Sequence, residues 1–430
     1  MQTVFLPVEV IARELTSRAF LSTKLANNGN KIYVFEHTFF DRNGWNEKGI
    51  YIGKNCFRTE VPYDKKYFFL MKQAGIKVWY LDEEGGVYTG DKKAQENRLM
   101  TRLTPSDLKE DDKILSWGNW QKRVFKTSQS LAKIEVSGNP GFDIIQPKYH
   151  DSFREFDSNI TNGLEDFILI NTRFSIGNPK QDYREIFGDN QPYAKNLPKL
   201  YLEESYISDN QMFFEMLDLC IYLSKKLPNE HIVIRPHPAE NIEIYKILTK
   251  KLENVSVIFN GGVESWIRKC KVLIHNGCTT AIQADIAKKK VISFVPTVTE
   301  YVPRIPNKIG IIATTKEEVL TAIDTSLISS NEAYIDTLSE LNSIDFIVNL
   351  IQKNNYDKEN SKKKSDLFIK ENIKDLLRGF FNLMLPRRLK KAFDYKEFSK
   401  IVELVKIANK HYNTNVNCKK LADGCYCIYK

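Results

Sequence analysis

The feature that most constrains the fold is the repeated alternation of short apolar runs with segments of helical spacing. In the first half, residues 3–8 form an apolar run that is followed by helical spacing from Glu9 to Asn27. Further strand-like runs follow at 32–35, 78–81 and 134–137. Strands that alternate with helices at this spacing predict a parallel sheet covered by helices.

The same pattern begins again after residue 155. Apolar strand-like runs occur at 167–170, 231–234, 255–259, 272–274 and 291–295, and helical patterns cover 210–226 and 280–287. We therefore expect an α/β chain of the GT-B type, with two Rossmann-like domains facing a cleft and a C-terminal helical extension. A length of 430 residues agrees with more than one domain. The expected domains are 1–155, 156–350 and a basic linker and helical tail over 351–430, with the interdomain linker near 148–165.

The positive charge of the chain lies in its tail. Residues 351–430 carry 19 Lys and Arg against 9 Asp and Glu, whereas the first 350 carry 44 against 45. A near-neutral body with a basic tail indicates a local contact with an anionic membrane surface rather than nucleic acid binding. The two apolar stripes at 369–384 and 398–408 predict helices that either pack on the body or lie on a membrane.

Several classes of protein are disfavoured. No apolar run is long enough to span a bilayer, and no secretory signal is evident, so we expect a cytoplasmic protein, peripheral at the inner face of the membrane. The seven cysteines are expected to be thiols, and the spacing of Cys418, Cys425 and Cys427 does not match a zinc ribbon or finger.

Two strand ends in the second half carry residues suited to phosphate. The strand 231–234 runs into Arg235-Pro236-His237-Pro238, and the strand 272–274 runs into His275-Asn276-Gly277-Cys278-Thr279-Thr280. Threonine hydroxyls and backbone N–H groups at a helix start favour phosphate, and Arg235 or His237 would add a donor and positive charge. The alternative is structural: Thr279 as an N-cap and His237 as a residue fixed between two prolines.

Two acidic turns in the first half are candidates for acid–base or nucleophilic chemistry. Asp82-Glu83-Glu84-Gly85 follows the strand 78–81, and crowding of carboxylates would raise the pKa of one of them, as a general base requires. Asn139 and Asp143 lie in the turn that follows the strand 134–137. A solvated acidic turn and an Asx cap are the structural alternatives.

The order Asp-Glu-Glu-Gly, Gly-Asn-Pro-x-x-Asp, Arg-Pro-His-Pro and Thr-Thr resembles bacterial surface-carbohydrate glycosyltransferases that use CMP-activated ulosonic acids. The resemblance covers about residues 1–310, and the retaining β-Kdo transferases of capsule, lipopolysaccharide and O-antigen assembly are the most similar group. Sialyl- and pseudaminyltransferases are more distant. Where such enzymes usually carry Arg, this chain has Gly141.

The resemblance implies roles for particular residues. Glu83 or Glu84 would be the acceptor base, and Asp143 would attack the anomeric carbon with overall retention. The CMP phosphate would be held by residues of the two loops in the second half, namely Arg235, His237, Pro238, His275, Asn276, Thr279 and Thr280. The donor or acceptor would also contact Asn139, Asn171, Thr172 and Arg173.

The expected reaction therefore moves an acidic sugar, Kdo first among them, from its CMP donor to a polysaccharide or lipid-linked glycan acceptor. We expect no cofactor and no metal, because a cationic, N–H-lined pocket can stabilise the departing phosphate. A CDP-glycerol-type polymer phosphotransferase, in which a first-domain histidine such as His37 would be the base, and a UDP-sugar epimerase are alternatives with the same architecture.

Overall fold

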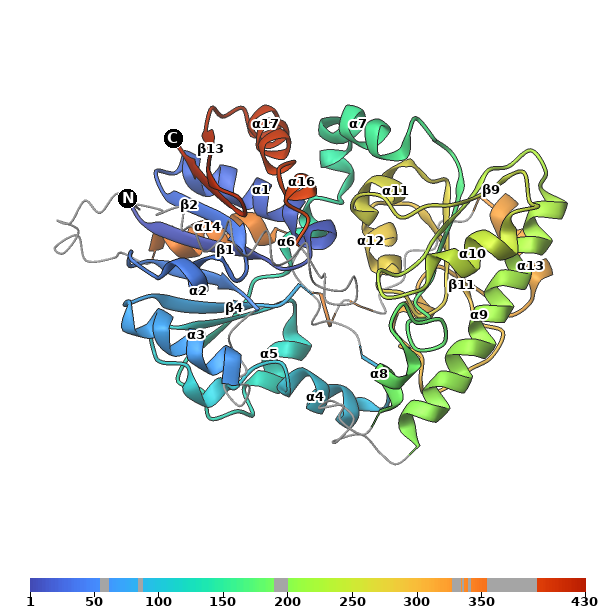
Figure 1. Cartoon of the computed structure of the whole chain (residues 1–430), viewed down its shortest axis with the longest axis horizontal. Helices are drawn as coiled ribbons and strands as arrows, with labels where there is room; N and C mark the ends of the chain where they lie inside the picture. Colours follow the sequence, from blue (N-terminus) through green and yellow to red (C-terminus); the bar gives the residue numbers. More distant parts are fainter. Residues whose placement is uncertain are drawn as a thin grey trace. The chain divides into compact units, whose positions relative to one another are not determined.

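The computed structural model describes residues 1–54, 62–83, 88–188, 200–326, 334, 336–338, 342–353 and 393–430. The chain divides into two compact units (Figure 1). Unit 1 comprises residues 1–83, 100–144 and 339–430, and unit 2 comprises 84–99 and 145–338. The predicted pair of Rossmann-like α/β domains is confirmed, since each unit is built on its own sheet of mainly parallel strands covered by helices.

Unit 1 is built on an eight-stranded sheet of order β13-β14-β2-β1-β3-β4-β5-β6. Its parallel part consists of β1 (Thr3–Val8), β2 (Lys31–Glu36), β3 (Ile50–Gly53), β4 (Lys77–Leu81), β5 (Lys113–Ser116) and β6 (Lys133–Val136). From β1 the chain proceeds to β2 on one side and then to β3 on the other. The carboxyl ends of β1 and β3 therefore form the topological switch point where ligands bind in open α/β sheets.

Helices of unit 1 cover this sheet. The long α1 (Ile11–Asn27) contacts α6 (Pro140–Asp143), α14 (Ser343–Lys353) and α17 (Ile401–Tyr412). The remaining helices are α2 (Phe39–Asn43), α3 (Pro62–Gln73), the 3₁₀ turn η1 (Pro105–Asp107), α5 (Asn119–Phe125) and α16 (Tyr395–Phe398).

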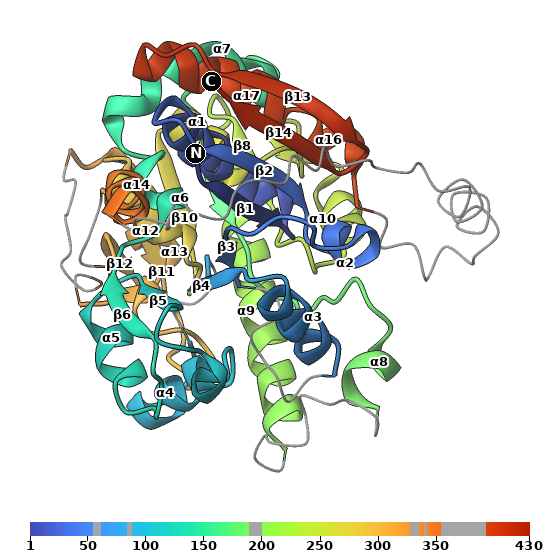
Figure 2. The same ribbon diagram turned by 90° about the vertical axis from the view of Figure 1, so that its left-hand side faces the viewer.

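The end of the chain completes the sheet of unit 1 (Figure 2). Strands β13 (Asn417–Ala422) and β14 (Cys425–Tyr429) form an antiparallel hairpin, and β14 pairs with β2. The helix expected around 398–408 is present as α17, which packs on α1, whereas the hairpin was not predicted. The basic segment around 362–364 and 387–391 and the stripe 369–384 lie outside the described residues, so membrane contact by the tail stays a prediction.

Unit 2 has six parallel strands in the order β12-β11-β10-β7-β8-β9. They are β7 (Ile168–Asn171), β8 (Ile232–Arg235), β9 (Val255–Val257), β10 (Val272–His275), β11 (Lys290–Phe294) and β12 (Ile311–Ala313). The chain runs from β7 to β8 on one side and later enters β10 on the other. The switch point of this unit therefore lies between β7 and β10.

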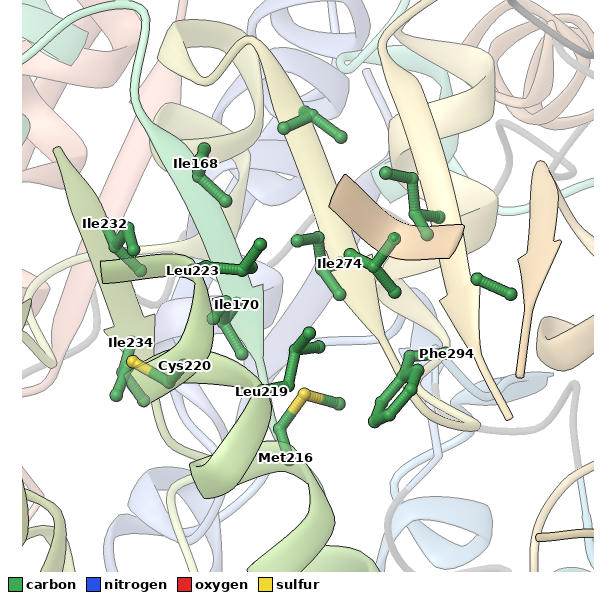
Figure 3. Packing of buried hydrophobic residues seen from close by; sticks show 14 of the residues in the cluster. Ile168, Ile170, Met216, Leu219, Cys220, Leu223, Ile232, Ile234, Ile274 and Phe294 are labelled. Atoms are coloured by element: carbon green, nitrogen blue, oxygen red, sulfur yellow. The ribbon is translucent and has the colours of Figure 1, made fainter. Parts of the chain in front are cut away.

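Helix α9 (Tyr201–Lys226) covers one face of this sheet. Figure 3 shows its Met216, Leu219, Cys220 and Leu223 above isoleucines of β7, β8 and β10. The other helices of this part are α4 (Lys92–Met100), α7 (Pro147–Thr161), α8 (Tyr183–Phe187), α10 (Ile242–Thr249), α11 (Val263–Lys269), α12 (Thr280–Ile286), the 3₁₀ turn η3 (Pro306–Lys308) and α13 (Lys316–Asp324). Because apolar side chains fill the faces of the sheet, polar chemistry is left to its edges.

The segment expected to be a linker, 148–165, is mostly helix. Pro147 at the first helical position starts α7, and Asn162 in the left-handed conformation ends it. Its apolar side chains recur at helical spacing among charged ones, and the helix packs on α11, where Arg268 bonds to the buried Asp157 at 2.6 Å. In the residues that the structure describes, no helix is long and apolar enough to cross a membrane.

The pairing of β14 with β2 predicts a stability effect. Ile428 is fully buried and pairs with Ile32, so Ile428→Ala should lower the free energy of unfolding by about 2–4 kcal/mol through loss of apolar contacts and creation of a cavity. Urea unfolding measures the change. The neighbouring Tyr429 is 37% exposed, and Tyr429→Ala should cost less. Equal effects would contradict the docked hairpin.

Candidate functional site

A row of polar residues ends the central strands of unit 2. The strand register aligns Arg235 of β8, Asn171 of β7, His275 of β10 and Ser293 of β11. The positions before them in β7, β8 and β10 are buried isoleucines, so the change from apolar to polar falls at the carboxyl edge. Ligands of parallel α/β sheets bind at this edge.

The loops after β7 and β10 are bonded to each other across the switch point. Asn171 donates through Nδ2 to Thr280 Oγ1 at 3.0 Å, and Arg173 donates through Nε to the carbonyl of Asn276 at 3.0 Å. Arg173 also pairs with Asp209 of α9 at 2.8 Å. The structure thus brings together the two sequence segments predicted to bind donor, and the ion pair of Arg173 lies within unit 2.

Gly277 allows these loops to approach. Its φ of +65° lies in the left-handed region, and a Cβ there would lie 2.6 Å from Val302 Cγ1 and 2.9 Å from Arg173 Nε. A larger residue would therefore push Arg173 out of its position.

His275 orders the loop after β10. Its ring is fully buried, and burial lowers its pKa to about 3, so the ring is neutral. Nδ1 accepts from the N–H of Cys278 at 3.3 Å, and Nε2 lies 2.9 Å from Ser293 Oγ, which itself donates to a carbonyl. With both nitrogens in these bonds, His275 supports the phosphate loop rather than adding positive charge to it.

Glu240 organises the other loop and was not predicted. This buried carboxylate accepts from Thr172 Oγ1 at 2.7 Å, from the N–H of His237 at 2.9 Å and from Tyr245 Oη. Burial raises its pKa, while these hydrogen bonds lower it. A glutamate in a polar loop carries no sequence signal of burial, so this link between the loops after β7 and β8 becomes visible only in three dimensions.

The Arg-Pro-His-Pro loop buries its arginine and leaves its histidine half-buried. Arg235 is buried, stacks on Phe259 with its guanidinium carbon 4.9 Å from the ring centroid, and donates to the carbonyl of Gly261 at 2.6 Å. His237 is half-buried, and its Nδ1 accepts from the N–H of Ala239 at 3.2 Å. In the neutral ring this bond places the proton on Nε2, which is then a donor. Pro238 is exposed.

The hydroxyl pair divides into two environments. Thr279 is exposed, and its side chain does not cap α12. The hydroxyl of Thr280 donates to Cys278 Sγ at 3.0 Å and accepts from Asn171, as described above. The structural alternative of a Thr279 N-cap is therefore not found.

Four buried polar atoms at this edge have no hydrogen-bond partner among the described residues. They are Asn171 Oδ1, Arg173 Nη2, Arg235 Nε and Asn276 Oδ1. A buried polar atom left without a partner costs about 1–3 kcal/mol, so such atoms normally meet water or a ligand. Two acceptors and two donors at the ends of three adjacent strands suit a polar, anionic molecule.

A second group of charged residues lies at the carboxyl edge of unit 1. Glu83 follows β4, is 7% exposed and pairs with Arg18 of α1 at 2.6 Å. Asp82 pairs with Arg102, and its backbone carbonyl accepts from Trp117 Nε1 at 2.6 Å. Asp82 and Glu83 are therefore buried rather than solvated. The other candidate base, Glu84, and Gly85 lie outside the described residues.

The pKa of Glu83 is raised to about 7. Burial is the largest cause, Arg18 and Lys54 oppose it, and the carboxylates of Glu14 and Asp82 add to it. The expectation that one carboxyl of this turn has a raised pKa is met, but desolvation and not crowding is the main reason.

The second acidic turn has structural contacts. Asn139 caps α6 by accepting from the N–H of Gly141 at 2.9 Å. Asp143 is 2% exposed, and its Oδ2 accepts from the N–H of Ile344 at 2.7 Å, in the first turn of α14. A carboxylate at a helix N-terminus is favourable, so this contact explains the residue without chemistry.

His37 and the cysteines add no further cluster. His37 Nδ1 lies 3.4 Å from Glu36, which also pairs with Arg42 within unit 1. In the described part of the chain, no three His, Cys, Asp or Glu side chains are grouped so as to hold a metal ion. Cys418, Cys425 and Cys427 are free thiols of the C-terminal hairpin.

Comparison with known proteins gives a structural likeness only. No protein-family profile matches the sequence, and no curated protein matches it. Among solved structures, UDP-GlcNAc 2-epimerase of Methanocaldococcus jannaschii is 13% identical with a TM-score of 0.44, and covers 82% of this chain and 99% of its own. The Neisseria meningitidis enzyme of the same name is 14% identical with a TM-score of 0.47, covering 82% and 100%. The wall teichoic acid polymerase TagF is 13% identical with a TM-score of 0.45, covering 82% and 88%.

The raised pKa of Glu83 predicts a pH-dependent stability. Between the ordinary glutamate pKa and about 7, the native Glu83 carboxyl keeps a proton that the unfolded chain has lost. The stabilisation that comes from binding this proton is full below the ordinary glutamate pKa and is lost as pH rises to about 7. Over that pH range the free energy of unfolding of the wild type should fall by up to about 1.4 kcal/mol per pH unit relative to that of Glu83→Gln. Urea unfolding of both proteins from pH 4.5 to 8 measures this, and a constant difference would contradict the raised pKa.

Proposed function

We propose that the protein is a sugar-nucleotide-dependent transferase that binds the donor phosphate at the carboxyl edge of β7, β8 and β10. The observation that carries the proposal is the group of four buried polar atoms without partners at this edge. A phosphate or ribose would supply acceptors to Arg173 Nη2 and Arg235 Nε, and ribose hydroxyls would donate to the two amide oxygens.

The neighbouring side chains suit a departing phosphate. Thr279 is exposed at the start of α12, and because Nδ1 of His237 accepts from the N–H of Ala239, Nε2 is the donor nitrogen of this ring. Arg173 is held by Asp209 and by the carbonyl of Asn276, so its guanidinium is oriented before any ligand binds. Donors fixed in advance stabilise the charge that develops on a leaving phosphate.

A CMP-activated ulosonic acid, Kdo first, is the donor that we favour. The support is the order of motifs in the sequence, together with two arginines, Arg173 and Arg235, whose guanidinium groups can meet a phosphate or the carboxylate of an acidic sugar. Glu83, with a pKa near neutrality, would take the proton of an acceptor hydroxyl on a surface polysaccharide or lipid-linked glycan. No metal is needed in this scheme.

Nucleotide binding tests the donor site. CMP, UDP, GDP and CDP-glycerol should be compared by thermal shift, because a ligand of the native state raises the melting temperature. We expect CMP to stabilise, and His237→Ala to weaken CMP binding about 10- to 100-fold through loss of a charge-assisted hydrogen bond. His231 lies directly before β8, at the opposite end of the strand from His237, so His231→Ala is the matched control.

The outcome of this panel separates the alternatives. Stabilisation by UDP without CMP would favour sugar epimerisation, and stabilisation by CDP-glycerol alone would favour a polymer phosphotransferase. Equal loss of CMP binding in the two histidine variants would remove His237 from the site.

Asp143 is proposed as the nucleophile of a retaining mechanism, and its contact with Ile344 sets the test. Asp143→Asn keeps an oxygen that accepts from this N–H and should cost only about 0.3–1 kcal/mol, whereas Asp143→Ala loses the cap and should cost about 1–2 kcal/mol. If Asp143 attacks the anomeric carbon, both variants lose transfer, and mass spectrometry of the wild type with donor detects a glycosylated Asp143 peptide.

A purely structural Asp143 gives a different pattern. Asp143→Asn would then transfer at nearly the wild-type rate, and no modified peptide would form. That result would end the covalent scheme while leaving the donor site intact.

A further inference from the structure

The buried charges around Glu83 form one connected group, here called the Glu83 cluster: Glu14, Arg18, Lys54, Asp82 and Glu83. Glu14 and Arg18 lie one turn apart on α1 and are each 1% exposed. Lys54 follows β3, and Asp82 and Glu83 follow β4. The group therefore lies at the switch point of unit 1, at the carboxyl ends of β1 and β3.

Arg18 holds Glu83 from one side. Its Nη2 lies 2.6 Å from Glu83 Oε1, and its Nε donates to the carbonyl of Pro7 at 3.2 Å. The bond to Pro7 ties the guanidinium to the end of β1, so its position does not depend on Glu83. Because its guanidinium is engaged by Glu83 and by the carbonyl of Pro7, we assign Arg18 an effect on Glu83 and not a contact with substrate.

Lys54 joins the second carboxylate to the group. Its ammonium lies 3.0 Å from Glu14 Oε1 and 3.3 Å from Glu9 Oε2. The other oxygen of Glu14 accepts from the N–H groups of Glu9 and Val10 at the start of α1. Glu14 is thus held beside Glu83 by the ammonium of Lys54 and by two backbone donors.

Two charges favour ionised Glu83 and two oppose it. Arg18 and Lys54 lower its proton affinity, whereas Glu14 and Asp82 raise it, and Asp82 is itself paired with Arg102. Among the described residues, Glu83 Oε2 has no hydrogen-bond partner. Oε1 therefore meets Arg18 as an ion pair, whereas Oε2 has neither an ion pair nor a hydrogen bond from the described residues.

We propose that Arg18 and Glu14 are positioning residues that act on Glu83 in opposite directions: Arg18 fixes the carboxylate with a positive charge, while Glu14 places a negative charge beside it. This inference rests on the proposed role of Glu83 as the acceptor base. The two residues contribute through the charge they present to Glu83 and not by touching the acceptor.

The experiment compares the pH dependence of kcat/KM for transfer from CMP-Kdo in three variants of the full chain. Arg18→Met should move the acidic midpoint upward by about one pH unit or more, because Glu83 loses its cationic partner. Glu14→Gln should move the midpoint downward, because an opposing carboxylate is neutralised. Arg18→Lys keeps the charge and should bring the midpoint back toward the wild-type value.

Lys24→Met is the matched control. Lys24 lies on the same helix and pairs with Asp345 at the surface, away from the Glu83 cluster, so its profile should equal that of the wild type. Shifts in the same direction for Arg18→Met and Glu14→Gln, or no shift in either, would overturn the inference.

A second measurement does not require transfer. The free energy of unfolding of Arg18→Met and of Glu14→Gln is followed from pH 4.5 to 9, each against the same variant with Glu83→Gln added. The difference reports the titration of Glu83 alone, and its midpoint should shift upward for Arg18→Met and downward for Glu14→Gln. Opposite shifts without any transfer would reject the proposed function and keep the electrostatic coupling, whereas transfer without such shifts would reject the coupling.

Discussion

The burial of both faces of the central parallel strands governs where polar chemistry can lie in this protein. In β7, β8 and β10 every position before the last is apolar and buried, and the last residue is Asn171, Arg235 or His275. Helices cover the sheet, so a polar side chain within a strand would lose its water without gaining a partner. The carboxyl edges are the remaining places, and the switch points separate the loops there enough to admit a ligand.

At both carboxyl edges the fold orients polar groups but leaves some of their atoms without hydrogen-bond partners among the described residues. His275, Glu240 and Gly277 hold the loops of unit 2, while Asn171 and Arg173 keep polar atoms without partners. In unit 1, Glu83 has one oxygen paired with Arg18 and one without a partner. Such groups lower stability in the free protein, and functional sites commonly show this trade between stability and activity. The supporting residues orient these groups during folding, so the groups need not be reorganised when a ligand binds.

The sequence was sufficient for the fold class and for the strands that end in motifs. Apolar runs at 3–8, 78–81 and 272–274 coincide with β1, β4 and β10 because buried parallel strands are continuous apolar segments. Strands β3, β5 and β14 were missed, since each has only four or five residues and mixes serine, cysteine or glycine with apolar positions. Short strands of this kind depend on their neighbours more than on their own composition.

The sequence predicted which strand ends of unit 2 carry polar residues, but it did not show which contacts each of these residues makes. Residue type placed His275 with the phosphate ligands, yet its depth in the sheet makes it a neutral support. Glu240 gave no sequence signal. Its partner Thr172 is distant in sequence, and Tyr245, although near in sequence, meets the carboxylate only through the turn of the chain between them. The contact of Asp143 with Ile344 spans about two hundred residues, a separation that no local pattern can reveal.

That separation has a consequence for synthesis of the chain. Residues 145–338 of unit 2 are continuous, so they can collapse while later residues are still being added. Unit 1 has to wait, because the edge of β2 is closed only by β14 and the start of α14 meets Asp143 only after unit 2 has been made. During that interval β2 presents an open strand edge, the kind of surface through which nascent chains pair wrongly.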